Sequence, residues 1–162
     1  MHPRAADLVK GLALEPHPEG GHYRQIYRST TNVQPLDVRP PRAALTTIYF
    51  LLTAGDVSRW HRVASDEAWH FYEGAPIELF SADQSFEQVE RHVLGPVNPP
   101  DVMPVHVVPA HRWQAARSLG DFTLVGCTVG PGFAFADFTL LRDLHDEAGR
   151  LRSIRPEFAL FT

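Results

Sequence analysis

The residues of this chain that are best suited to chemistry are a histidine and a glutamate, His61 and Glu67, which stand six residues apart. An imidazole changes its protonation state near neutral pH, and a neighbouring carboxylate can orient the ring or share a proton with it. Both side chains are also ligands of transition metals. The pair therefore indicates one of three roles: proton transfer, metal binding, or a buried pair that satisfies only its own hydrogen bonds.

The spacing places His61 and Glu67 on two consecutive strands joined by a tight turn, but it leaves their register open. If the turn has two residues, His61 pairs with Ala68 and shares a face of the sheet with His70. If the turn has three residues, His61 pairs with Trp69 and shares a face with Glu67. A slip of one residue exchanges the two faces, so the pattern alone is compatible with both arrangements.

A second polar cluster lies near the start of the chain and comprises Glu19, Gly20, Gly21, Tyr23 and Arg24. Adjacent glycines permit backbone conformations that a side chain forbids, including a close approach to a ligand. On the residues alone this cluster is a turn after a helix. The alternative is one end of a ligand site, with Arg24 or Arg28 as the group that binds an anion. Two histidines near the glycines are expected to be exposed: His17 and His22.

Many short strands must position these residues. Helical spacing occurs near the start, in residues 5–14, and Pro16 ends that segment. Segments rich in β-branched and aromatic residues then follow at regular intervals, over residues 45–53, 57–63, 67–72, 77–82, 86–94, 105–109, 113–116, 123–129 and 135–141. Fourteen prolines against eleven glycines also disfavour a helix bundle. We therefore expect one all-β domain over residues 1–162, a sandwich or barrel with a short N-terminal helix.

Composition excludes several classes of protein. The net charge of −4 and the lack of a basic cluster argue against nucleic-acid binding. No apolar run is long enough to span a membrane. The single cysteine, Cys127, excludes a disulfide within the chain, so a cytoplasmic location is expected. This cysteine lies in an apolar strand and is interpreted as a small buried hydrophobe. Asp137 lies between apolar neighbours, and we expect it to pair with a buried arginine.

Two segments resemble the motifs of the cupin superfamily. The first resembles the motif G-x5-H-x-H-x3-E-x6-G, with Val63 in place of the second histidine and the other positions held by Gly55, His61, Glu67 and Gly74. The second resembles P-x-G-x2-H-x3-N, with Gln114 in place of the histidine. Four blocks in order, HPEGG, HRVxSDExWHFYEG, VPAHRWQAA and VGCTVGPGFAFADF, are similar to one small cupin family of largely unknown function.

The resemblance implies a jelly-roll barrel, or double-stranded β-helix, with His61, Glu67 and Gln114 pointing into its lumen. It also implies the three-residue turn, a small-molecule ligand in the lumen and a homodimer formed sheet to sheet. By analogy with related sugar epimerases, we expect an isomerase or epimerase acting on a small carbonyl or sugar-type compound. His61 would abstract a proton, Glu67 would hold its tautomer, and Tyr23 or Tyr72 would return a proton. The residues expected to bind the ligand are Glu19, Gly20, Gly21, Arg24, Trp69 and Gln114.

The resemblance also raises the question of whether the lumen binds a metal. If a divalent transition metal is bound, its ligands would be His61, Glu67 and Gln114. Because Val63 and Gln114 replace two imidazoles of the motif, and a neutral amide is a poor ligand for such metals, no cofactor is expected. Two other functions stay open: a binding protein that does not turn its ligand over, and a metal-dependent dioxygenase or lyase with a degenerate site.

Overall fold

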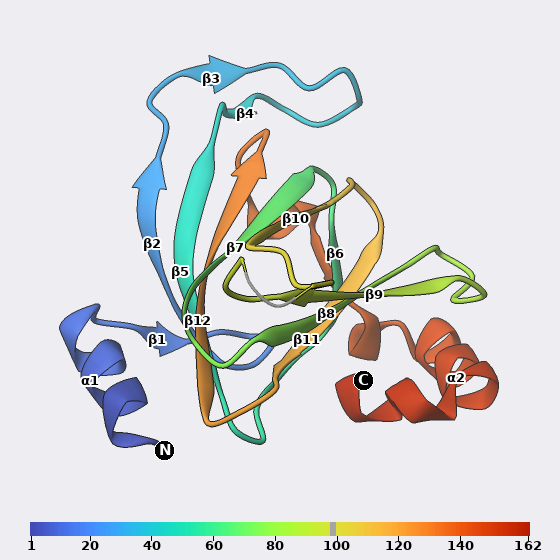
Figure 1. Ribbon diagram of the computed structural model, residues 1–162. Helices are drawn as coiled ribbons and strands as arrows, with labels where there is room; N and C mark the ends of the chain where they lie inside the picture. Colours follow the sequence, from blue (N-terminus) through green and yellow to red (C-terminus); the bar gives the residue numbers. More distant parts are fainter. Residues whose placement is uncertain (98–99) are drawn as a thin grey trace.

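The computed structural model describes residues 1–97 and 100–162 and consists mainly of two facing β-sheets (Figure 1). The larger sheet contains, in spatial order, β1 (Glu15–Pro16), β2 (His22–Arg28), β5 (Thr46–Thr53), β12 (Phe122–Gly130), β7 (Asp66–Gly74) and β10 (Val105–Val108). The smaller sheet contains β13 (Phe138–Leu140), β6 (Val57–Val63), β11 (Trp113–Ser118), β8 (Ile77–Ala82) and β9 (Val89–Leu94). This architecture confirms the predicted cupin jelly-roll barrel with a short N-terminal helix.

The consecutive strands β6 and β7 lie in different sheets, so neither of the two registers considered above is formed. His61 on β6 instead pairs with Gln114 on β11 and Leu140 on β13. Glu67 on β7 pairs with Val129 on β12. The short connection between β6 and β7 is thus a corner that carries the chain from one sheet to the facing one, and it brings His61 and Glu67 to a shared lumen.

The outer face of the smaller sheet is covered by the C-terminal part of the chain. On β6, Trp60 points outwards and His61 inwards, because neighbouring residues of a strand alternate between its faces. Helix α2 (His145–Ile154) and the 3₁₀ helix η3 (Pro156–Phe161) pack on that outer face, with Phe161 against Trp60. The C-terminal part of the chain thus adds two helical elements, α2 and η3, to the predicted all-β domain.

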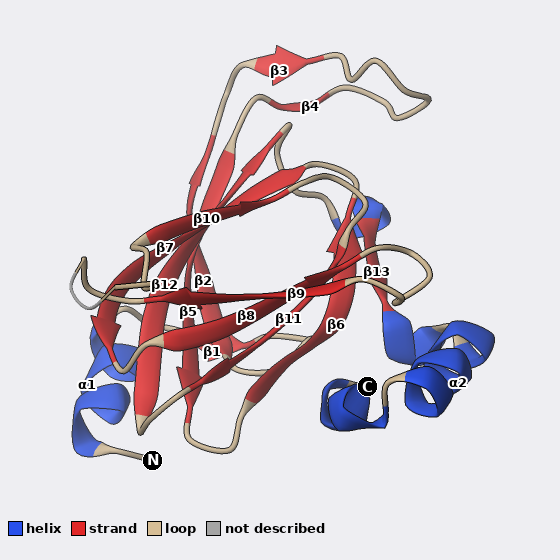
Figure 2. Cartoon of the chain, turned by 45° about the vertical axis from the view of Figure 1, so that its right-hand side comes forward, coloured by secondary structure: helices blue, strands red, loops and turns tan. Residues whose placement is uncertain are grey.

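The outer face of the larger sheet is covered by helix α1 (Pro3–Gly11), on the opposite side of the barrel from α2 (Figure 2). Its buried residues Ala5 and Leu8 pack on Leu51 and Leu124. Within the described ranges, no helix has the length and apolar character needed to cross a membrane.

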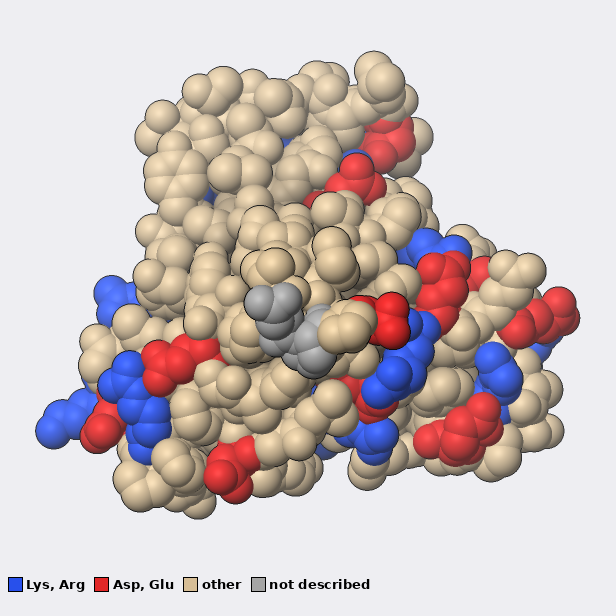
Figure 3. Space-filling view, viewed as in Figure 1, with Lys and Arg blue, Asp and Glu red and all other residues tan. Residues whose placement is uncertain are grey.

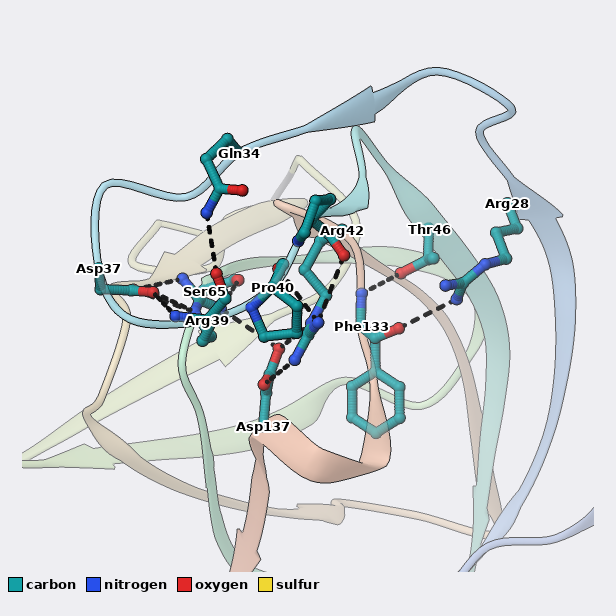
Figure 4. A network of polar contacts seen from close by, with 11 residues as sticks. Arg28, Gln34, Asp37, Arg39, Pro40, Arg42, Thr46, Ser65, Phe133 and Asp137 are labelled. Carbon is teal, nitrogen blue, oxygen red and sulfur yellow. Dashed lines mark hydrogen bonds and ion pairs between the residues drawn. The ribbon is translucent and has the colours of Figure 1, made fainter.

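An arm of the chain, residues 29–45, extends above the barrel and contains β3 (Asn32–Val33) and β4 (Arg42–Ala43) (Figure 1). The side of the arm that faces the viewer in Figure 3 carries few charged side chains, whereas charges gather lower on the molecule. Arg42 anchors the arm through two hydrogen bonds of 2.8 Å to the carboxylate of Asp137, and Arg39 also contacts Asp137 (Figure 4). The expected pairing of Asp137 is confirmed, and these hydrogen bonds hold the pKa of its carboxyl below the usual value.

Candidate functional site

A cavity of about 310 Å³ lies between the two sheets, where the barrel interior is not filled by the apolar core. Four buried or nearly buried polar side chains converge on it: His17, Glu19, His61 and Glu67. The rest of the lining is mainly apolar or aromatic and comprises Glu15, Tyr23, Gln25, Thr46, Ile48, Phe50, Val63, Cys127, Val129, Phe133, Phe135 and Phe138. A concave, mostly apolar cavity with a few convergent polar groups is typical of a small-molecule site.

His61 is held as a neutral base with a defined tautomer. Its Nδ1–H donates a 2.8 Å hydrogen bond to the carbonyl of Arg59, so the lone pair of the neutral ring is on Nε2. Burial lowers the pKa of His61, whereas the nearby charge of Glu67 acts in the opposite direction. Nε2 lies 3.3 Å from Oε2 of Glu19. The imidazole therefore presents the lone pair of Nε2 to the carboxyl group of Glu19, at the lining of the cavity.

Glu19 is the partner that faces His61, and strand β6 holds it in place. Its Oε1 accepts a 2.7 Å hydrogen bond from Ser58 Oγ, and its backbone carbonyl accepts one of 2.9 Å from the Arg59 amide. Burial raises the pKa of Glu19 to about 8, although the bond from Ser58 acts against this. At neutral pH the side chain is thus mostly a carboxylic acid, and it can donate a proton.

His17 contacts the same carboxyl from the other side, with Nδ1 3.4 Å from Oε2 of Glu19. The expectation that His17 is an exposed loop residue is wrong, because its side chain is only 6% exposed and lines the cavity. Burial, and then the charge of His61, lower the pKa of His17 to about 3. The sequence signal for this residue was its place beside Glu19 in the HPEGG block, where a tight turn returns the chain towards the barrel.

The two glycines of that block bring the turn against the barrel. Gly20 has a φ of +117°, and a Cβ there would lie 2.1 Å from the carbonyl oxygen of Val57. A Cβ on Gly21 would lie 2.6 Å from the carbonyl oxygen of Leu51. The close approach that glycine permits is therefore to the protein's own strands, and Gly20 and Gly21 position Glu19 and do not line the cavity.

Glu67 is held by a chain of hydrogen bonds that crosses the barrel. Trp69 Nε1–H donates to Gln114 Oε1 at 2.9 Å, and Gln114 Nε2–H donates to Glu67 Oε2 at 2.5 Å. Trp69 and Gln114 thus lie behind Glu67 and outside the cavity lining. Burial raises the pKa of Glu67, while the charge of His61 acts against it. Among the described residues no hydrogen bond joins His61 to Glu67, so the Arg59 carbonyl orients the imidazole in place of the expected carboxylate.

The two tyrosines of the expected site have different positions. Tyr23 lines the cavity, with its ring 4.4 Å from that of His17 in an edge-on contact. Tyr72 is half exposed and packs against Tyr49 on the outer face of the larger sheet. Arg24 is exposed and donates a 3.2 Å hydrogen bond to the carbonyl of Leu12. Tyr72 and Arg24 therefore lie outside the candidate site, since neighbouring residues on a strand point to opposite faces.

The three residues expected to bind a metal, His61, Glu67 and Gln114, are not arranged to hold a metal ion. The oxygen of the Gln114 amide accepts from Trp69, and its NH2 group donates to Glu67, so the amide is bonded to these two residues. In the part of the chain that the structure describes, no group of three or more His, Cys, Asp or Glu residues is arranged to hold a metal ion. Cys127 lines the cavity, but burial raises its pKa well above the usual value and keeps it a thiol.

The rim of the cavity is aromatic and fixed by the backbone. Phe133 donates its amide hydrogen to Thr46 Oγ1 at 2.9 Å, and its carbonyl accepts from Arg28 Nη1 at 3.2 Å (Figure 4). Phe135, which is 57% exposed, packs edge-on against Phe133. The residues 135–137 form a 3₁₀ turn, η1, where the sequence predicted the beginning of a strand. This turn directs Phe135 to the mouth of the cavity.

The two facing sheets and the polar lumen define the class of protein as a cupin. The chain belongs to the family described as "Cupin superfamily (DUF985)", whose model matches residues 6–141. A solved structure of a hypothetical protein from Leishmania major is similar, with 28% sequence identity, a TM-score of 0.84 and coverage of 97% of this chain and 96% of that chain. A protein from Shewanella oneidensis is 35% identical, with a TM-score of 0.80 and coverage of 96% and 92%.

More distant similarity shows the fold alone. Oxalate decarboxylase from Bacillus subtilis shares 12% identity with this chain, with a TM-score of 0.58 over 85% of this chain and 33% of that one. No curated protein matches the sequence. The fold alone therefore does not define the function, which depends on the side chains of the lumen.

Proposed function

We propose that this protein is an isomerase or epimerase that moves a proton at a carbon next to the carbonyl group of a small molecule bound in the lumen. One observation carries the proposal: a neutral imidazole and a buried carboxylic acid, His61 and Glu19, face the same cavity 3.3 Å apart. A base and an acid side by side are the two groups that an enolisation needs.

The proposed steps balance in protons and electrons. His61 Nε2 removes the proton from the carbon, the C–H electrons form the C=C bond, and Glu19 gives its proton to the carbonyl oxygen. The products of this half-reaction are an enediol, an imidazolium and a carboxylate. In the second half, the imidazolium returns its proton to the neighbouring carbon, and the other enediol hydroxyl gives its proton to Glu19. For epimerisation the returning proton must reach the opposite face of the carbon, and Tyr23 is the proposed donor. The enol hydroxyl then gives its proton back to Glu19. His61 and Tyr23 return to their starting states when the imidazolium loses its proton to solvent and the tyrosinate takes one up.

Other residues of the lumen support this pair. The negative charge of Glu67 favours the imidazolium that forms on His61, since opposite charges attract strongly where water is excluded. His17 and Ser58 hold the carboxyl of Glu19 from its other sides. Both are positioning residues in this proposal, because neither acts on the carbon that loses its proton.

Solvent deuterium exchange tests the proposal directly. Small aldoses, ketoses and other carbonyl compounds are incubated with the protein in D2O, and the loss of C–H signals is followed by NMR. We expect exchange with the unmodified protein and a loss of roughly 10² to 10⁴ in its rate for His61→Gln and for Glu19→Gln. His70→Gln, on the same strand as Glu67 but outside the cavity lining, is the control and should exchange normally. Binding of a compound without any exchange would instead identify a binding protein.

We also propose that the protein acts as a homodimer in the cytoplasm. Support for the dimer comes from the apolar arm above the barrel, where Leu36 and Val38 are fully exposed. Exposed apolar groups of this kind are typical of protein interfaces. Support for the location comes from the single buried cysteine, Cys127, which has no partner for a disulfide within the chain.

A further inference from the structure

The groups around the cavity that can carry a full negative charge are carboxyls, and one of them, Glu19, is mostly protonated at neutral pH. Three carboxyl groups line the cavity, those of Glu15, Glu19 and Glu67, and no described lining residue is Lys or Arg. Glu19 and Glu67 are buried at the inner end, whereas Glu15 is exposed. A ligand that enters this cavity therefore meets acidic groups on the way in and at the end of its path.

Arginines near these lining residues in sequence do not change this balance. Arg62, next to His61, lies over the ring of Trp113 and outside the cavity lining, and backbone carbonyls hold three others elsewhere. Arg24 donates to Leu12, Arg28 donates to Phe133, and Arg59 donates to the carbonyl of Glu19. None of the three lines the cavity. A phosphate or carboxylate on the ligand would lose its water without gaining a cationic partner, which is unfavourable.

The aromatic lining of the cavity favours a ligand with a positive charge. Phe50, Tyr23, Phe133, Phe135 and Phe138 present rings to the cavity, and a ring attracts a cation through the negative charge of its face. An ammonium group in the lumen would also provide the buried carboxyl of Glu67 with an opposite charge. In water-poor surroundings such a pair is much stronger than at a surface.

We propose that the substrate of this lumen is an amine-bearing carbonyl compound, such as an amino sugar or an amino ketone, and not a phosphorylated or carboxylated one. The carbonyl part rests on the proposed function, whereas the ammonium part rests on Glu15, Glu67 and the aromatic lining. The preference for a ligand with an ammonium group is therefore a property of binding, and it can be measured without turnover.

The test uses a set of small fragments in which each skeleton occurs with an ammonium, a hydroxyl and a carboxylate group. Binding to the full chain at pH 7 is measured by ligand-detected NMR and calorimetry. We expect the ammonium member of a skeleton to bind at least tenfold more tightly than its hydroxyl member, and the carboxylate member to bind weakest. Equal or tighter binding of the neutral or anionic members, or a set without ammonium binders, would overturn the proposal.

Variants locate the effect in the cavity. Glu15→Gln and Glu67→Gln should each reduce the preference for ammonium severalfold, and the exposed Glu15 can be replaced without disturbing the core. Glu147→Gln, which removes an exposed carboxylate on α2, should leave it unchanged. If both cavity variants keep the preference for ammonium, the proposed position of the ammonium group beside Glu15 and Glu67 is wrong. If ammonium compounds bind but no deuterium exchange occurs, the proposed isomerase function is wrong and the proposed preference for ammonium stands. If neutral compounds exchange deuterium and ammonium compounds do not bind, the proposed preference for ammonium is wrong and the isomerase function stands.

Discussion

Burial decides what each titratable residue of the lumen can do. Glu19 and Glu67 are both carboxyls at the edge of one cavity, and burial raises the pKa of both. His17 and His61 are both imidazoles, and burial lowers the pKa of both. The shift of Glu19 keeps that carboxyl mostly protonated at neutral pH, and the shifts of the two imidazoles favour their neutral forms. A protonated acid and a neutral base are the two groups that the proposed proton transfer at carbon needs.

The pKa of Glu19 predicts how stability changes with pH. The folded value of about 8 lies above the value of 4.5 expected when the chain is unfolded. Its contribution is thus complete below pH 4.5 and is lost as the pH rises to 8, with a slope approaching about 1.4 kcal/mol per pH unit. Glu19→Gln should flatten the decline of the free energy of unfolding across this window, measured by urea denaturation. Parallel pH curves for the two proteins would contradict the prediction.

The pKa of His17 predicts the opposite dependence at acid pH. The folded value of about 3 lies below the unfolded value of 6.5, because the buried imidazole resists protonation. The stability that depends on a neutral His17 is present above pH 6.5 and is lost as the pH falls to 3. His17→Gln should make the free energy of unfolding less sensitive to pH between these values. His145→Gln, at an exposed position at the start of α2, is the control and should not change how the free energy of unfolding falls at acid pH.

At the scale of elements, the turn that holds Glu19 depends on glycine. Gly20→Ala should lower the free energy of unfolding by more than about 2 kcal/mol, because it adds a clash with Val57 to the cost of a positive φ. Gly55→Ala is the matched control, since Gly55 has a φ of +87° but nothing within 4 Å of the added Cβ. Denaturation of both variants separates the clash from the backbone strain. Equal losses would show that Val57 moves away without cost.

The strands of this barrel were far easier to predict than their pairing. The bounds of β6 and β8 were predicted correctly, because both segments are bounded by clear breaks. Strand β2 was missed because its polar and half-exposed residues give no apolar alternation. Pairing β6 with β7 failed because periodicity gives the face of a strand but not the sheet to which it belongs. The contact of Glu19 with His61 was hidden for the same reason, since it joins distant segments.

At the scale of the whole molecule, the exposed arm leads to a test of the proposed dimer. Leu36 and Val38 lie on the arm, while Tyr27 is half exposed on β2 below it. Leu36→Asp combined with Val38→Asp should shift the protein to a monomer, because burying two carboxylates in an apolar contact is costly. Light scattering over a range of concentrations measures this shift. Leu160→Asp, at an exposed site in η3 near the C-terminus, is the control and should leave the dimer intact. If the unmodified protein is a monomer at every concentration, the proposed dimer is refuted.

One residue of β6 has a consequence for how the substrate of this lumen could be changed. The carbonyl of Arg59 orients His61, and the amide of the same residue holds the backbone of Glu19. Acid and base are therefore fixed to a common piece of main chain, which does not depend on the side chains at the mouth. Replacing Glu15, Phe133 or Phe135 would change what enters the lumen and leave the spacing of the reacting groups as it is. The choice of ligand thus depends on side chains at the entrance, whereas the proposed acid and base depend on the main chain of β6.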